Sequence, residues 1–191
     1  MPQPQPPELS IDALKALAHP LRQRMLTRLQ RLGPATSAEL SVEFGADRGA
    51  TSYHLRQLAR YGFIRVDASL SAGRRKYWRS VPQDIRLPRD PRNAEVGAAV
   101  EAVGRQWMDK AAAELDAYLN NRDAFGAFAP AAMHSFGSTV LSADELAAFG
   151  EEYIALLNRW QRDHSEAAPE SRPITVVFHA FPTPDETSAP R

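Results

Sequence analysis

The side chains best suited to binding chemistry fall into two short stretches of this 191-residue chain. On one side of a helix drawn over residues 48–61 lie hydroxyl, aromatic and guanidinium groups, namely those of Arg48, Ser52, Tyr53 and Arg56. The second stretch is a run of three cations, Arg74, Arg75 and Lys76. Neither set contains a carboxylate, and such groups suit base edges and phosphates. We therefore predict that both stretches contact double-stranded DNA, with Arg56 contacting a guanine.

Side chains for acid–base or metal chemistry form no comparable pattern. The chain has no cysteine, which excludes thiolate metal sites and disulfides, and its five histidines never fall at a close pair spacing such as i, i+4. No glycine-rich phosphate loop or nucleophile elbow is present. We predict no catalytic residue, no metal and no cofactor. A less favoured alternative is an enzyme built from acids and bases of the second half, namely Asp109, Glu114, Asp116, His134, Asp163 and His164.

The elements that must position the first stretch are marked by caps and glycines. Thr36 with Glu39 predicts a capping box for a helix that ends at Phe44. Gly45 predicts a turn, and Asp47 then predicts the N-cap of a helix from Arg48 to Tyr61 that Gly62 terminates. The spacing buries Thr51, Leu55 and Leu58 on the side opposite the predicted DNA contacts. Two helices around a tight turn are typical of a helix-turn-helix.

A basic hairpin follows. Residues 63–66 predict a short strand, residues 67–73 are turn-rich, and residues 74–79 predict a returning strand. We expect Trp78 to face inward and Tyr77 outward. This hairpin is the wing of a predicted winged helix-turn-helix.

Three segments resemble the ArsR-type bacterial repressors. They are residues 14–26, residues 51–58 with 61–64 behind them, and residues 73–77, all within residues 11–81. The resemblance implies a dimeric winged helix-turn-helix whose second motif helix enters the major groove, usually in a repressor released by an effector. Family members that sense thiophilic metals carry cysteines on the first motif helix, whereas residues 39–44 here have none. We therefore expect no thiolate metal sensor.

The distribution of charge, and the positions of proline and glycine, divide the chain into segments. Residues 1–92 hold 16 Lys and Arg against 8 Asp and Glu, while residues 93–191 hold 7 against 15, so a basic half that suits phosphates precedes an acidic half that DNA repels. We predict a disordered proline-rich tail over 1–10 and a DNA-binding domain over 11–90. This domain begins with helices over 11–18 and from Pro20 to Gly33. A dimerisation and possible effector region over 93–182 and a disordered tail over 183–191 follow. No stretch predicts a membrane span or signal peptide, so we expect a cytoplasmic, nucleoid-associated protein.

The second half begins with a long predicted helix over 95–121. Apolar side chains form one stripe along it, which we assign to a homodimer contact: Val96, Val100, Val103, Trp107, Ala111, Leu115 and Tyr118. Residues 132–141 and 174–181 predict strands around a helix that Ser142 caps and that runs to about residue 162. The fold class is therefore mostly α with a small β-α-β-like C-terminal part. Its strands would pair either within one subunit or across a dimer.

Some residues have structural as well as functional interpretations. We expect His19 to cap or pack at a helix start, and His54 to pack or contact a phosphate. The aromatic residues of the second half either form a core, which we favour, or line a pocket for a small apolar or aromatic effector: Trp107, Tyr118, Phe125, Phe128, Phe136, Phe149, Tyr153 and Trp160. The favoured function is a dimeric repressor of an inverted-repeat operator. The alternative is a winged-helix module that binds proteins, which the three consecutive cations disfavour.

Overall fold

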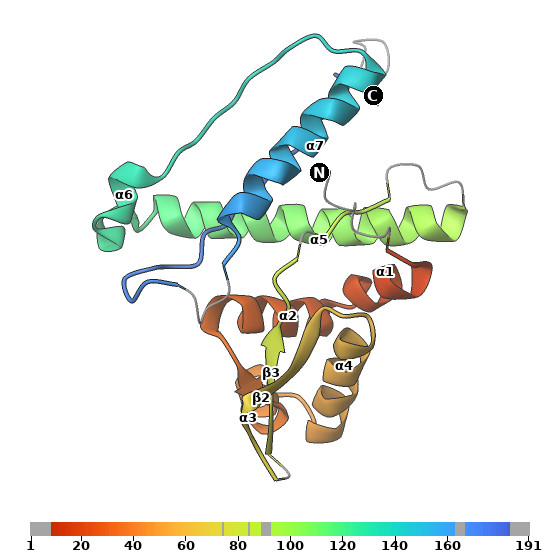
Figure 1. Cartoon of the computed structure of the whole chain (residues 1–191), viewed down its shortest axis with the longest axis vertical. Coiled ribbons are helices and arrows are strands. Elements are labelled where there is room, and N and C mark those ends of the chain that lie inside the picture. Colours follow the sequence, from red (N-terminus) through yellow and green to blue (C-terminus); the bar gives the residue numbers. More distant parts are fainter. Residues whose placement is uncertain (1–8, 74, 84, 89–92, 163–166, 184–191) are drawn as a thin grey trace. The chain divides into compact units, whose positions relative to one another are not determined.

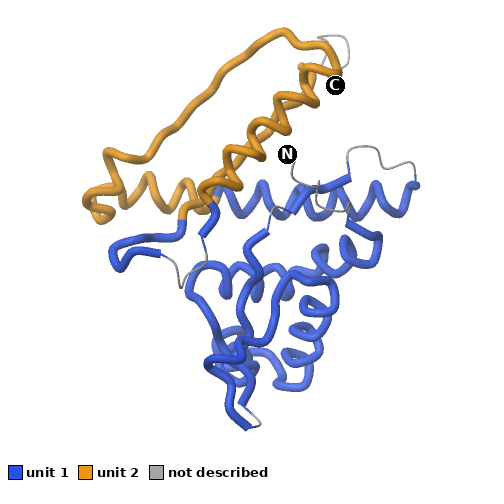
Figure 2. The backbone as a smooth tube through the Cα atoms, in the orientation of Figure 1, with its two compact units in different colours: residues 1–112, 161–173 blue, residues 113–160, 174–191 orange. Residues whose placement is uncertain are grey.

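The computed structural model describes residues 9–73, 75–83, 85–88, 93–162 and 167–183. Among these residues the chain forms two compact units (Figure 2). Unit 1 comprises residues 1–112 and 161–173, and unit 2 comprises residues 113–160 and 174–191. The predicted tails lie almost wholly outside the described residues, as do Arg74, Asp163 and His164.

Unit 1 is built from four short helices, a small sheet and most of a long helix (Figure 1). The short helices are α1 (Ile11–Ala18), α2 (Pro20–Leu32), α3 (Ser37–Phe44) and α4 (Arg48–Arg60). Their starts follow the caps in the sequence, because Ser10, Thr36 and Asp47 each accept a backbone N–H at a helix N-terminus. The predicted capping box of Thr36 and Glu39 is present, with both reciprocal hydrogen bonds formed.

The sheet has three antiparallel strands in the order β1-β3-β2. The strands are β1 (Ala35–Thr36), β2 (Ile64–Ala72) and β3 (Arg75–Ser80). The prediction that the first wing strand stops near residue 66 was wrong, because β2 continues through Asp67 to Ala72 with a register irregularity between these two residues. Asp67 allows this continuation, since its carboxylate accepts hydrogen bonds from Ser69 N and Oγ at 3.0 and 2.6 Å and pairs with Arg79 at 3.3 Å.

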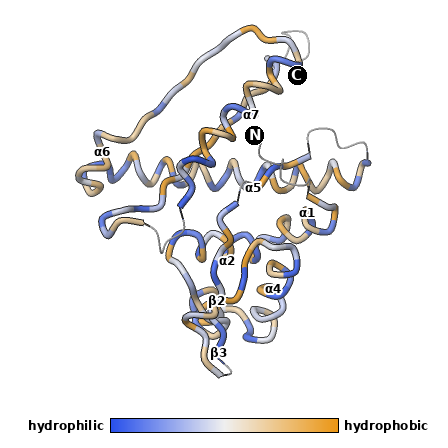
Figure 3. Tube along the Cα trace, viewed as in Figure 1, coloured by the Kyte–Doolittle hydropathy of each residue, from blue (hydrophilic) through white to orange (hydrophobic). Residues whose placement is uncertain are grey.

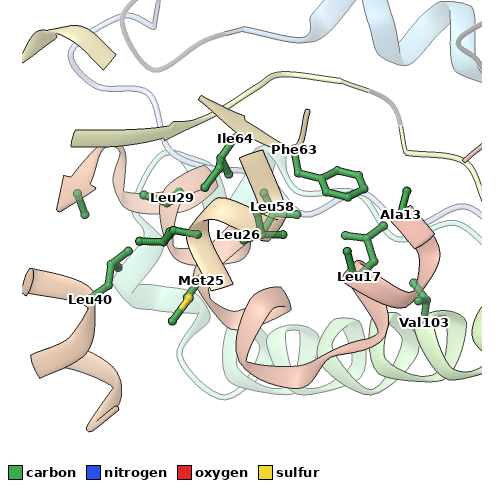
Figure 4. Packing of buried hydrophobic residues seen from close by; sticks show 13 residues of the cluster. Ala13, Leu17, Met25, Leu26, Leu29, Leu40, Leu58, Phe63, Ile64 and Val103 are labelled. Carbon is green, nitrogen blue, oxygen red and sulfur yellow. The ribbon is translucent and has the colours of Figure 1, made fainter. Parts of the chain in front are cut away.

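The core of unit 1 lies between these helices and the sheet (Figure 4). Leu55 and Leu58 of α4 and Thr51 beside them are fully buried, as the helical spacing predicted. Trp78 packs against the cluster from β3, in agreement with its expected inward position. Phe63 and Ile64, which follow the glycine that ends α4, are also buried. The core therefore fixes both α4 and the base of the wing.

Helix α5 (Ala94–Leu119) contributes to this same core and corrects the predicted dimer contact. Val103 is fully buried in the unit 1 cluster, and Trp107 packs against that cluster. Gln106 donates a hydrogen bond from Nε2 to the Ala18 carbonyl oxygen at 2.9 Å. The middle of the apolar stripe thus covers its own domain, which removes Val103 as a contact to a second subunit. Sequence spacing showed that the stripe needs a partner and could not show that unit 1 is that partner.

Unit 2 holds the end of α5, a 3-10 turn η1 (Arg122–Phe125), α6 (Phe128–Ala131) and α7 (Ala143–Trp160). Tyr118, another predicted dimer residue, meets Phe125 edge to face with ring centroids 5.1 Å apart. The strands predicted over 132–141 and 174–181 are absent from the described residues, so the β-α-β-like part was wrong in its strands and correct in its helix. Strand propensity produces a strand only when a ladder partner is available. The mostly helical fold class with a small sheet is confirmed.

Candidate nucleic-acid interface

Helix α4 separates its two faces as the sequence predicted. Three of the four predicted contact residues on this helix, Arg48, Tyr53 and Arg56, are exposed, and Tyr53 retains 50% of its accessible surface. Ser52 is half-buried. A helix held by one buried face and exposing donors on the other has the form needed to enter a major groove.

The start of α4 is fixed by a carboxylate cap. Asp47 accepts the Ala50 N–H at 2.9 Å through Oδ1, and its carbonyl oxygen accepts the Thr51 hydroxyl at 2.9 Å. A Cβ added at Gly49 would lie 2.9 Å from Asp47 Oδ1, so a larger residue there would displace the cap.

The turn between α3 and α4 is equally constrained. Gly45 has φ of 59° and ψ of 32°, a left-handed conformation, and its N–H donates to the Ser41 and Val42 carbonyl oxygens. Glycine adopts this conformation at little cost, whereas most other residues do not. The relative direction of the two motif helices therefore depends on Gly45.

The wing carries its cations on β3. Arg75 pairs with Glu39 of α3 at 3.1 Å, and its guanidinium lies 5.0 Å from the centroid of the Tyr77 ring. Both members of the ion pair are exposed, so the pair contributes about 0–1 kcal/mol and phosphate can compete for Arg75. Lys76 is exposed beside it, and Arg74 lies outside the described residues.

The two carboxylates nearest the wing are already compensated. Hydrogen bonds from Thr36, with Arg75 nearby, lower the pKa of Glu39. Hydrogen bonding from Ser69, with a smaller contribution from Arg79, lowers the pKa of Asp67. Both groups are therefore ionised at neutral pH but hold partners of their own, which limits their repulsion of a phosphate.

A contact that the sequence did not reveal joins α4 to the junction of α1 and α2. The rings of His19 and His54 lie 4.4 Å apart between centroids, and His19 Nδ1 accepts the Leu21 N–H as the N-cap of α2. Desolvation is the largest cause that lowers the pKa of each imidazole, and nearby Arg22 lowers both further. The capping role expected for His19 is confirmed, and His54 packs. No spacing rule would pair residues 35 positions apart.

Arg22 is itself held at this junction. Its Nε and Nη2 donate hydrogen bonds to the carbonyl oxygens of Ala16 and Lys15 at 2.5 and 2.7 Å, which provides partners for carbonyl groups at the end of α1.

Among the described residues, no group of three or more His, Asp and Glu side chains could hold a metal ion. Within the same residues no helix has the length and apolar character to cross a bilayer.

Comparison with known proteins identifies this region. Residues 17–67 match a family model described as a helix-turn-helix domain, and β2 and β3 add the wing. This part of the chain is a winged helix-turn-helix domain. The predicted resemblance to ArsR-type regulators is confirmed for this domain. No curated protein matches the chain.

The solved structures to which the chain is similar share little sequence identity with it. Reduced HlyU from Vibrio cholerae is 23% identical over 50% of this chain and 85% of its own, with a TM-score of 0.33. A possible transcriptional regulator for arsenical resistance is 24% identical over 56% of this chain and 97% of its own, with a TM-score of 0.33. An apo variant of Lactococcus lactis ZitR is 12% identical over 75% and 84%, with a TM-score of 0.35.

Proposed function

We propose that this protein is a sequence-specific transcriptional regulator that binds duplex DNA as a homodimer and represses by occluding polymerase. The observation that carries the proposal is the acid-free exposed face of α4, held from behind by Thr51, Leu55 and Leu58 and followed by a basic wing. As a DNA-binding regulator of transcription, it would act in the cytoplasm, at the nucleoid.

In this proposal the two stretches have different roles. Arg56 is the guanine contact, since a guanidinium can bond guanine O6 and N7 together, and Arg48, Ser52 and Tyr53 contact neighbouring bases. Arg75 and Lys76, with Arg74, hold phosphates or the minor groove beside the motif and set the register. Two copies would place two α4 helices in successive major grooves about 34 Å apart, so the operator would be an inverted repeat.

The proposal is tested by selecting genomic DNA fragments on the purified protein. Enrichment of an inverted repeat, lost for Arg56→Ala but kept for Arg105→Ala, would support it. Arg105 is a suitable control because it lies on α5 and pairs there with Glu101. Binding of a protein partner without any enrichment of DNA would favour the winged-helix interaction module instead.

A further inference from the structure

Two extended segments of unit 2 expose an unusual amount of apolar surface. They are residues 132–141 and 174–181, which form no ladder with any described residue. Phe136 and Val140 are fully exposed, at 102% and 98%. Other large apolar residues of the two segments are also exposed: Met133, Leu141, Ile174, Val176, Val177 and Phe181. Backbone that is extended, apolar and unpaired is a template for pairing with another strand.

Helix α7, which connects these segments, is only partly covered. None of its 18 residues is buried, although apolar residues recur along it at helical spacing (Figure 3). Phe178 stacks on Tyr153 with centroids 3.9 Å apart and planes at 10°, and lies 5.7 Å from Phe149. Leu156 and Trp160 stay exposed further along the helix. Phe178 therefore attaches residues 174–181 to one part of α7, whose large apolar side chains are otherwise half-buried or exposed.

The exposed area is large enough for a stable interface. At about 200 Å² for a fully exposed aromatic side chain, Phe136, Phe181 and Trp160 together present roughly 500 Å². The exposed aliphatic residues of the segments and α7 add on the order of 400 Å². The total of about 900 Å² is comparable to the roughly 800 Å² per partner of a standard interface.

Charge favours a second copy of this chain as the occupant. Unit 2 is acidic, so most of its surface would repel another copy, but residues 132–141 and 174–181 contain no Asp, Glu, Lys or Arg. Contact between copies through these two segments therefore brings no like charges face to face, although α7 itself carries four acidic residues and one basic residue. Each copy offers two strand-forming segments, so a two-fold arrangement can give each of them a ladder partner.

We propose that residues 132–141, residues 174–181 and the exposed face of α7 form the homodimer interface, with the extended segments pairing as strands across the two-fold axis. This inference deepens the proposed function, because it assigns the contact that joins two DNA-binding domains, and it rests on that function only for its biological purpose. It replaces the middle of α5, where Val103 is buried in its own domain.

The test compares the full-length parent with Phe136→Glu/Val140→Glu by sedimentation at micromolar concentration. Both side chains are fully exposed within one chain, so the variant should fold with unchanged circular dichroism and Tm of its winged domain. We expect a dimeric parent and a dimer dissociation constant at least about 100-fold higher in the variant, since buried unpaired charges are strongly unfavourable. The control Val42→Glu places a charge at a large apolar residue of α3 that is 82% exposed, and this variant should stay dimeric.

Hydrogen exchange provides a second measurement that does not depend on a variant. Amides of residues 174–181 should exchange slowly in the parent and rapidly in Phe136→Glu/Val140→Glu. A monomeric parent, a variant that remains dimeric, or rapid exchange of these amides in the parent dimer would each overturn the interface. A monomeric parent would also assign the face to a different occupant, such as an apolar effector. A dimer that behaves as expected but binds no DNA would contradict the proposed function and leave this interface intact.

Discussion

The wing gives the sharpest quantitative prediction. Arg75→Ala/Lys76→Ala removes two exposed cations of β3, and each phosphate contact contributes about 0.9 to the slope of log affinity against log salt. The slope should therefore fall by about 1.8. When the salt concentration rises fourfold, from 50 to 200 mM, this difference in slope means that the affinity of the parent should fall about 12-fold more than that of the variant. Fluorescence anisotropy with an operator and with an unrelated duplex should show the same change in slope.

The ion pair of Arg75 with Glu39 makes this prediction more specific. Glu39→Gln removes the carboxylate charge and retains a residue that can complete the capping box with Thr36. It should free Arg75 and leave DNA affinity equal to or a few-fold above that of the parent. Arg105→Ala, which removes one cation from α5, should leave the slope unchanged. An unchanged slope for Arg75→Ala/Lys76→Ala, or an equal fall for Arg105→Ala, would refute the assignment of the wing to phosphate contacts.

Three further predictions concern the reader helix, the core and pH. Arg56→Ala should cost about 1–3 kcal/mol on a specific site and relax preference at one base pair, measured by a binding selection. Val103→Ala should lower the free energy of unfolding by about 2 kcal/mol in urea titrations, from two lost carbons and the resulting cavity, whereas Val42→Ala on the surface should change it little. The pKa values of His19 and His54 in the folded state lie below the unfolded value of about 6.5, so the folded protein favours their neutral forms. The free energy of unfolding should therefore keep its full value above about pH 6.5 and should fall as the pH is lowered below it. His54→Gln should reduce this dependence, and a stability that is flat from pH 7.5 to 5.5 would contradict it.

The DNA-binding half could be predicted from the sequence because its signals are local. The capping box of Thr36 and Glu39, the left-handed Gly45 and the N-cap Asp47 each determine backbone geometry within a few residues. Their spacing placed both motif helices to within about a residue of where the structure has them. The extension of β2 past Asp67 was not predictable in this way, because it depends on pairing with β3 across the hairpin.

The remaining features depend on contacts between distant residues. The contact of His19 with His54 joins separate helices, and the burial of Val103 depends on how α5 lies against unit 1. The segment from Ile174 has strong strand propensity but finds no ladder partner among the described residues of its own chain. Periodicity identifies surface that needs a partner, and it does not identify which partner covers it.

The central claim, that α4 and the wing bind a two-fold DNA site, is tested most directly by footprinting the DNA fragment most enriched on the purified protein. The account predicts protection of two major-groove segments about 34 Å apart, related by an inverted repeat, with flanking backbone protection that disappears in Arg75→Ala/Lys76→Ala. Enrichment of no fragment, or a protected site that is unchanged in Arg56→Ala and in the wing variant, would contradict it.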